Sequence, residues 1–182
     1  MQLTDTCLTE ALRHYRDRWQ GEAATVAQFE AFLRTDGDVF DRRHGGGHFT
    51  GSCWLVSADG RRVLLMHHRK LGLWLQPGGH ADGDADLARV ALREAREETG
   101  LTGLRVEGGI FDVDRHRIPA RRDEPDHWHY DVRYVVRAGL DDRFVVNHES
   151  HALAWRSMTE VADDISLDAS LRRMARKWLA RA

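Results

Sequence analysis

Residues 79–101 read GHADGDADLARVALREAREETGL, a glycine turn that runs directly into a helix-forming segment. Residues 84–99 begin with an acidic turn, and Gly100 stands where a left-handed residue commonly ends a helix. We therefore predict a helix over residues 84–99. The turn before it contains Gly78 and Gly79, which lack a side chain and so let the backbone approach a ligand closely.

Three glutamates of the predicted helix share one face. Glu94, Glu97 and Glu98 stand at positions i, i+3 and i+4, which lie on the same side at about 100° per residue. Like charges at these spacings cost about 0.2–0.5 kcal/mol per pair, and anions in the last turn also oppose the helix dipole. A solvated surface tolerates that cost, and a bound divalent cation reverses it. The glutamates alone leave both interpretations open.

Taken together with the glycine turn, residues 79–101 resemble the Nudix box of the Nudix hydrolases. Five fixed positions of that pattern are filled by Arg93, Glu94, Glu97, Glu98 and Gly100. One fixed position differs, because Ala85 stands where the family usually has a glutamate that helps to hold the loop and the helix together. Asp84 and Asp86 flank this position and are candidates to replace that glutamate.

The resemblance implies hydrolysis of a diphosphate linked to another group, with water attacking phosphorus. It also implies Mg²⁺ or Mn²⁺ as the cofactor, with Glu94, Glu97 and Glu98 as metal ligands and the backbone carbonyl of Gly78 as a further ligand. Cleavage of a phosphoanhydride needs neutralised phosphoryl charge, a water in line and a base, which metals on a carboxylate face can supply. Arg93 looks like the residue that orients Glu94.

The catalytic base has two candidates. Members of the family differ in whether the base belongs to the box or to a later loop. Glu149, in the segment Asn-His-Glu-Ser at 147–150, is the loop candidate. Glu94 is the candidate within the box.

The rest of the chain predicts a sheet with helices on both faces. Segments rich in β-branched and aromatic residues indicate strands at 48–57, 63–68, 106–114, 128–137 and 152–157. Helical periodicity indicates helices at 5–33, with a break at Gly21, and at 166–181. We expect an α/β (α+β) fold with a mixed sheet, similar to the Nudix α/β/α sandwich. A helical extension, residues 1–44, would pack on a Nudix domain, residues 45–182, which includes the C-terminal helix.

Polar side chains alternate along the strand predicted at 128–137. Its polar face consists of His127, His129, Asp131 and Arg133. A similar polar edge on the preceding strand consists of Asp112, Asp114 and His116. A substrate-facing wall, a zinc site and plain solvent exposure are all compatible with this pattern, although the sequence lacks a close-spaced Cys/His signature for zinc.

We select His129, Asp131 and Arg133 from this face as candidate substrate-binding residues. Arg121 and Arg122, in the loop between the two strands, are further candidates. Guanidinium groups bind phosphate through paired hydrogen bonds, so these arginines would clamp a terminal phosphate. A solvated loop is the alternative.

The composition restricts the partners. The chain has 182 residues, and Lys+Arg 27 against Asp+Glu 29 gives a net charge of −2, so no global basic field would attract nucleic acid or an anionic membrane. No apolar stretch of about 18 residues and no secretory signal is present, and two cysteines do not make a disulfide framework. We expect a cytoplasmic protein that acts on a small molecule, with a homodimer as the candidate assembly.

The leading hypothesis is a pyrophosphohydrolase for a nucleoside diphosphate derivative, namely a sugar nucleotide, a dinucleoside polyphosphate or a modified nucleotide. Two alternatives stay open. A non-catalytic nucleotide-sensing module would keep the fold without the reaction, with Ala85 as a sign of decay. An enzyme similar to isopentenyl diphosphate isomerase would need a reactive cysteine, for which Cys53 is the candidate.

Overall fold

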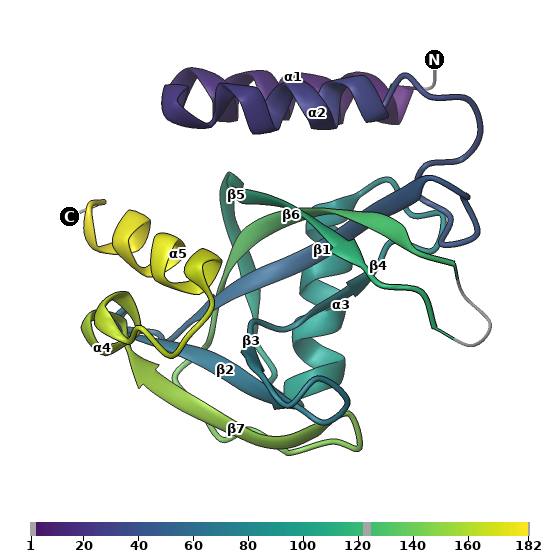
Figure 1. The fold of residues 1–182 in the computed structure, drawn as a ribbon. Helices are drawn as coiled ribbons and strands as arrows, with labels where there is room; N and C mark the ends of the chain where they lie inside the picture. Colours follow the sequence, from purple (N-terminus) through teal and green to yellow (C-terminus); the bar gives the residue numbers. More distant parts are fainter. Residues whose placement is uncertain (1–2, 122–124, 182) are drawn as a thin grey trace.

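The computed structural model describes residues 3–121 and 125–181, and one mixed sheet forms its centre (Figure 1). The strands are β1 (Gly47–Val56), β2 (Arg62–His68), β3 (Trp74–Leu75), β4 (Gly78–His80), β5 (Arg105–Ile118), β6 (His127–Arg137) and β7 (Ser150–Ser157). They lie in the order β3-β2-β1-β6-β5, with β4 paired to β1 and β7 paired to β2. β1 and β6 run parallel, and the other pairs are antiparallel. The expected mixed sheet is confirmed.

The helices agree with the sequence pattern except at their ends and in one short segment. They are α1 (Leu3–Arg18), α2 (Ala23–Phe32), α3 (Leu87–Thr99), α4 (Met158–Asp163) and α5 (Ala169–Leu179), with a 3-10 turn η1 (Gln20–Glu22) at the predicted break. α3 begins after residue 84 because the Asp86 side chain caps it, accepting a hydrogen bond from Arg89 N at 3.0 Å. The sequence pattern does not predict β3, β4 or α4, which are too short to show a period.

Helices cover both faces of the sheet. Alternation along β1 places Cys53 and Leu55 in the core that α3 completes, and Trp54 and Val56 in the core beneath α4 and α5. Figure 1 shows α3 on one side of β1 and α5 on the other. The expected α/β/α arrangement is therefore confirmed. Among the described residues, no helix is long and apolar enough to cross a membrane.

The N-terminal helices α1 and α2 lie side by side over β5 (Figure 1). Phe32 of α2 stacks on Tyr130 of β6 with ring centroids 3.9 Å apart, and Phe29 meets the same ring edge-on at 5.3 Å. All three rings are buried, and such rings contribute strongly to core stability. The N-terminal helices thus share a hydrophobic core with the sheet.

A network of buried charges centres on Asp112 of β5, whose side chain is fully buried. Its carboxylate lies 3.2 Å from Arg133 of β6, and 2.7 and 2.6 Å from Arg173 and Lys177 of α5. Lys177 also lies 2.5 Å from Glu22 of η1. Buried charges are tolerated when they are paired and hydrogen-bonded. Asp112 therefore connects the sheet, α5 and the N-terminal segment.

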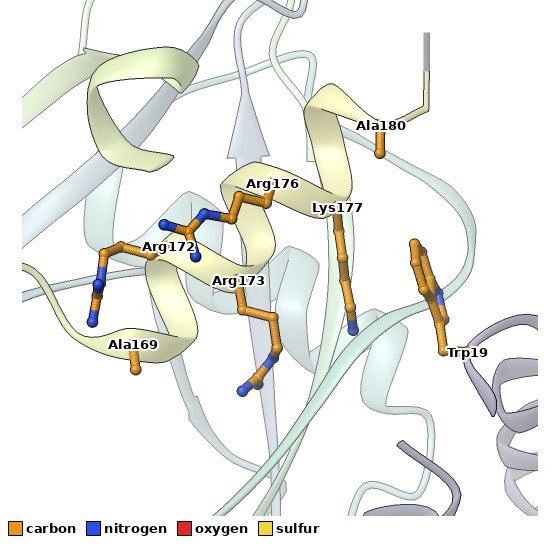
Figure 2. A pocket seen from close by; sticks show the side chains of 7 residues that line it. All are labelled: Trp19, Ala169, Arg172, Arg173, Arg176, Lys177 and Ala180. Atoms are coloured by element: carbon orange, nitrogen blue, oxygen red, sulfur yellow. The ribbon is translucent and has the colours of Figure 1, made fainter. Parts of the chain in front are cut away.

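A hollow beside this network is lined largely by basic side chains (Figure 2). It is lined by Trp19, Ala169, Arg172, Arg173, Arg176, Lys177 and Ala180. In Figure 2, Lys177 extends from α5 toward Trp19, and Nζ lies 4.9 Å from the ring centroid. Because Lys177 and Arg173 are both bound to carboxylates, the hollow has less charge to offer a ligand than its residue types indicate.

Replacing Asp112 by Asn should destabilise the fold strongly, because its cationic partners would lose a buried counter-charge. We expect D112N to lower the free energy of unfolding by about 3–5 kcal/mol, measured by urea denaturation with tryptophan fluorescence. Asp141→Asn is the matched control, since Asp141 pairs with Arg143 at an exposed position and should leave the midpoint nearly unchanged. Equal midpoints for the two variants would contradict the central role of Asp112.

Candidate active site

Helix α3 and strand β4 bring two glutamates of the box against a glycine backbone. Glu98 Oε2 accepts a hydrogen bond from Gly78 N at 2.9 Å. Gly79 lies so close to Glu94 that a Cβ at this position would be 2.6 Å from Glu94 Cδ. Residue 79 must therefore lack a side chain if Glu94 is to keep its position.

Arg93 fixes the orientation of Glu94 and connects α3 to β4. Its Nη2 donates to Glu94 Oε1 and to His80 O, both at 2.8 Å. Its Nε also donates to Glu94 Oε1, at 3.2 Å. A planar guanidinium that makes several such bonds holds a carboxylate in one orientation. Glu97 lies exposed on the same helix.

The ionised form of the carboxylates in this site is energetically unfavourable when no cation is bound. Burial, together with the charges of neighbouring carboxylates, raises the pKa of Glu98 to about 8, against the lowering effect of the Gly78 N–H. Burial also raises the pKa of Glu94, against the effect of Arg93. A divalent cation would reverse these electrostatics, and carboxylate oxygens are donors that Mg²⁺ and Mn²⁺ prefer. The donor set of Glu94, Glu97 and Glu98 therefore fits a divalent metal.

The loop between β4 and α3 is held in place without the glutamate that the Nudix pattern has at position 85. Ala85 packs against the hydrophobic core instead. Arg89 donates to both oxygens of Asp84, at 2.6 and 2.8 Å. Arg42, from the segment before β1, pairs with Asp82 at 2.5 Å. These bonds, with the cap at the start of α3, hold the loop to the helix and to the segment before β1.

Glu149 approaches the box from the loop before β7. Asn147 Nδ2 donates to Glu97 O at 3.4 Å, and Arg69 N donates to Glu149 O at 2.9 Å, so the loop is attached on both sides. The Glu149 charge is one of the causes, after burial, that raise the pKa values of Glu94 and Glu98. Its side chain is 50% exposed and so is accessible to water. The structure thus brings this candidate base to the site.

The polar residues of β6 form cross-strand rows with β1 and β5. In the order β1, β6, β5 the rows are His48, His129, His116; Thr50, Asp131, Asp114; and Ser52, Arg133, Asp112. The Asp131 carboxylate accepts hydrogen bonds from Thr50 Oγ1 at 2.8 Å and from Ser52 Oγ and Arg133 Nε at 2.7 Å. The predicted alternation is confirmed.

Burial decides which of these polar residues are open to a ligand. Asp131 and Arg133 are 2% and 3% exposed, so the solvent-exposed alternative is wrong for both. A direct substrate contact by either would require the buried network to open, whereas His129 is only partly buried. Arg121 is exposed, and Arg122 lies outside the described residues. The substrate-binding assignments stay predictions.

The sequence analysis does not identify two histidines on this face, His48 and His80. His48 alternates with Thr50 and Ser52, and this period of two in β1 is the signal that would reveal it. His80 belongs to a strand of three residues, which carries no periodic signal. His48 is fully buried, and His80 pairs with Thr50 in the sheet.

Comparisons with known proteins agree with this architecture. A family model described as NUDIX domain matches residues 48–181. A Mycobacterium tuberculosis protein named "Putative 8-oxo-dGTP diphosphatase 3" is 34% identical over 143 residues, which cover 72% of this chain and 64% of the relative. The chain thus spans less than two thirds of that relative's length.

Solved structures share the fold. A Caenorhabditis elegans Ap4A hydrolase in a binary complex has a TM-score of 0.58 at 18% identity, covering 73% of this chain and 96% of that chain. A NUDIX-family hydrolase from Clostridium perfringens has a TM-score of 0.56 at 24% identity, covering 74% and 97%. These identities support the fold alone. Because the family model spans most of the chain and includes the glutamate helix, the chain belongs to the Nudix family.

Proposed function

We propose that this chain is a divalent-metal-dependent pyrophosphohydrolase that cleaves a nucleoside diphosphate linked to another moiety. The observation that carries the proposal is the position of Glu94 and Glu98 against the Gly78–His80 backbone. Glu98 is buried and Glu94 partly buried beside it, at a cost to the metal-free protein that a purely structural helix would avoid.

The residues of the glutamate site would have different roles in the reaction. Glu94, Glu97 and Glu98, with the carbonyl of Gly78, would hold Mg²⁺ or Mn²⁺. Such an ion, when bound, neutralises phosphoryl oxygens and lowers the pKa of water. Arg93 keeps the Glu94 carboxylate in one orientation, which avoids reorganisation during the reaction.

Glu149 is our choice of base. Its side chain is half exposed, so water can reach it, and its loop is attached to α3 and to the turn after β2. Glu94 is the second choice, since its Oε1 already accepts hydrogen bonds from Arg93. A base must lie within hydrogen-bond reach of the attacking water, directly or through one further water.

The substrate class is a small nucleoside diphosphate derivative. The names of the Mycobacterium tuberculosis relative and the Caenorhabditis elegans neighbour place an oxidised nucleotide and a dinucleoside polyphosphate first among the compounds to test. Sugar nucleotides complete the panel. An isomerase reaction is disfavoured, because Cys53 is fully buried and burial raises the pKa of its thiol well above the ordinary value.

Release of phosphate or nucleotide from this panel, with and without Mg²⁺ or Mn²⁺, tests the function directly. We expect metal-dependent turnover with at least one compound. Glu98→Gln should lower that turnover about 100-fold or more, because it removes a metal-ligand charge. Glu97→Gln should act in the same direction.

The same variant has a second readout in thermal unfolding. Without metal, E98Q should melt at or above the wild-type temperature, because folding of the wild type must either bury the Glu98 charge or protonate the carboxylate, and a neutral amide avoids both. The rise in melting temperature on adding Mg²⁺ should be lost. Binding of nucleotides without any turnover would instead identify a sensing module, and full turnover by E98Q would reject the metal assignment.

Substitutions at the two glycines of β4 should separate site geometry from folding. In G79A the three atoms nearest to the new Cβ all belong to the end of the Glu94 side chain, so the fold should persist while Mg²⁺ stabilisation and turnover fall. In G78A the Cβ would lie 2.1 Å from Ser52 Oγ and 2.7 Å from Ser52 Cα, so the fold itself should lose stability. Gly21→Ala is the control, with no atom near its Cβ. This geometry would be contradicted if G79A lost stability in denaturation assays while G78A kept the stability of the wild type.

Glu149→Gln tests the base. If Glu149 accepts the proton of the attacking water, turnover should fall about 10²- to 10⁴-fold while the apparent affinities for substrate and Mg²⁺ stay nearly unchanged. Steady-state kinetics at saturating metal measures both. A parallel loss of Mg²⁺ affinity would make Glu149 a ligand, and unchanged turnover would return the base to Glu94.

A further inference from the structure

A second potential metal site lies beside the glutamates and has a different donor chemistry. Histidine side chains from β1, β4, β5 and β6 gather at one end of the polar face: His48, His80, His116, His127 and His129. The His48 ring lies 5.0 Å from His80 and 4.7 Å from His129, centroid to centroid. Strand register produces this group, since His48 pairs with His129 and His129 pairs with His116.

His48 is the residue that a packing role does not explain. Its side chain is fully buried, and among the described residues neither ring nitrogen has a hydrogen-bond partner. Buried polar atoms are nearly always hydrogen-bonded, and leaving one without a partner costs about 1–3 kcal/mol. An imidazole that is buried without hydrogen-bond partners and faces other imidazoles has a nitrogen lone pair available to a metal ion.

The spacing of the nitrogen atoms is close to what a tetrahedral zinc ion needs. One ligand nitrogen from each of His48, His80 and His129 can be chosen so that all three lie within 4.8 Å of one another. Bonds of 2.0–2.1 Å around a tetrahedral ion place neighbouring nitrogens about 3.3 Å apart, so small side-chain rotations would close the site. His127 Nε2 already lies 3.2 Å from His129 Nε2.

His127 is oriented as a further metal ligand would be. Its Nδ1 lies 2.9 Å from Pro125 O, and donation to that carbonyl leaves Nε2 with its lone pair directed at His129. A backbone carbonyl that orients the second nitrogen is the usual support for a histidine ligand. Imidazole must be neutral to bind a metal, and burial lowers the pKa of His48 to about 4 and that of His129 to about 2.

We propose that His48, His80 and His129 bind a transition-metal ion of the Zn²⁺ type, at a site separate from the glutamates. Imidazole nitrogen favours Zn²⁺ over Mg²⁺, while the oxygen donors of the box favour Mg²⁺, so the two sites differ in the ions they select. A bound ion would connect β1, β4 and β6 through one side chain each. It would therefore stabilise β4, whose His80 carbonyl also accepts a hydrogen bond from Arg93.

The test is titration of the full, metal-stripped chain with Zn²⁺ in excess Mg²⁺, followed by calorimetry and thermal unfolding. We expect one Zn²⁺ per chain with a dissociation constant below about 1 μM, and a higher melting temperature. His48→Gln and His80→Gln should each weaken binding by about 100-fold or more. Substituting Co²⁺ should give the visible absorption of a tetrahedral nitrogen site in the wild type but not in these two histidine variants.

Two controls separate this site from its alternatives. His14→Gln changes an exposed histidine of α1 and should leave Zn²⁺ binding unchanged, as should Glu98→Gln. The proposal is overturned if the wild type takes up no Zn²⁺, if E98Q abolishes uptake, or if the histidine variants bind like the wild type. Circular dichroism confirms folding of each variant, and His80→Gln, at a partly exposed position, keeps the test decisive if H48Q does not fold.

Discussion

The carboxylate of Asp112 is the interaction on which the arrangement of the other elements depends. It pairs at once with Arg133 of β6 and with Arg173 and Lys177 of α5, and Lys177 extends the network to Glu22. An unpaired charge in the interior is costly, so loss of one member leaves its partners uncompensated. The positions of the sheet, the C-terminal helix and the N-terminal segment are interdependent for this reason, although their charged residues lie far apart in the sequence.

The same network reaches the candidate active site through β1. It continues to Asp131, which accepts hydrogen bonds from the hydroxyl groups of Thr50 and Ser52. These two residues of β1 pair with His80 and Gly78 of β4, so the strand that contacts the box glutamates rests on the strand that the network holds. The buried ion pairs of Arg133 with Asp112 and Asp131 therefore support β1 and β4 on one side of the site.

The sequence predicts the candidate glutamate site better than its surroundings because the residues of that site are close together in the chain. Residues 79–101 are contiguous, and helical periodicity alone places the glutamates on one face. The burial of Arg133 and the meeting of His48 with His129 depend instead on the register of a parallel strand pair, which alternation within each strand does not specify. Period two shows which residues share a face of a strand, but not which residues of another strand lie beside them. The short strand β4 is not predicted, because three residues are too few to show a period of two.

Strand β4 is the point at which the two kinds of donor meet. Gly78 donates its N–H to Glu98, Gly79 leaves room for Glu94, and His80 turns its ring toward the histidines while its carbonyl accepts from Arg93. A displacement of β4 would therefore disturb the glutamates and the histidines together. The Nudix pattern has a glutamate in the loop after β4 where this chain has Ala85. The position of β4 therefore depends more on the bonds of the neighbouring residues Asp82 and Asp84. An ion bound by the histidines would hold β4 through His80, and occupancy of one site would then affect the geometry of the other.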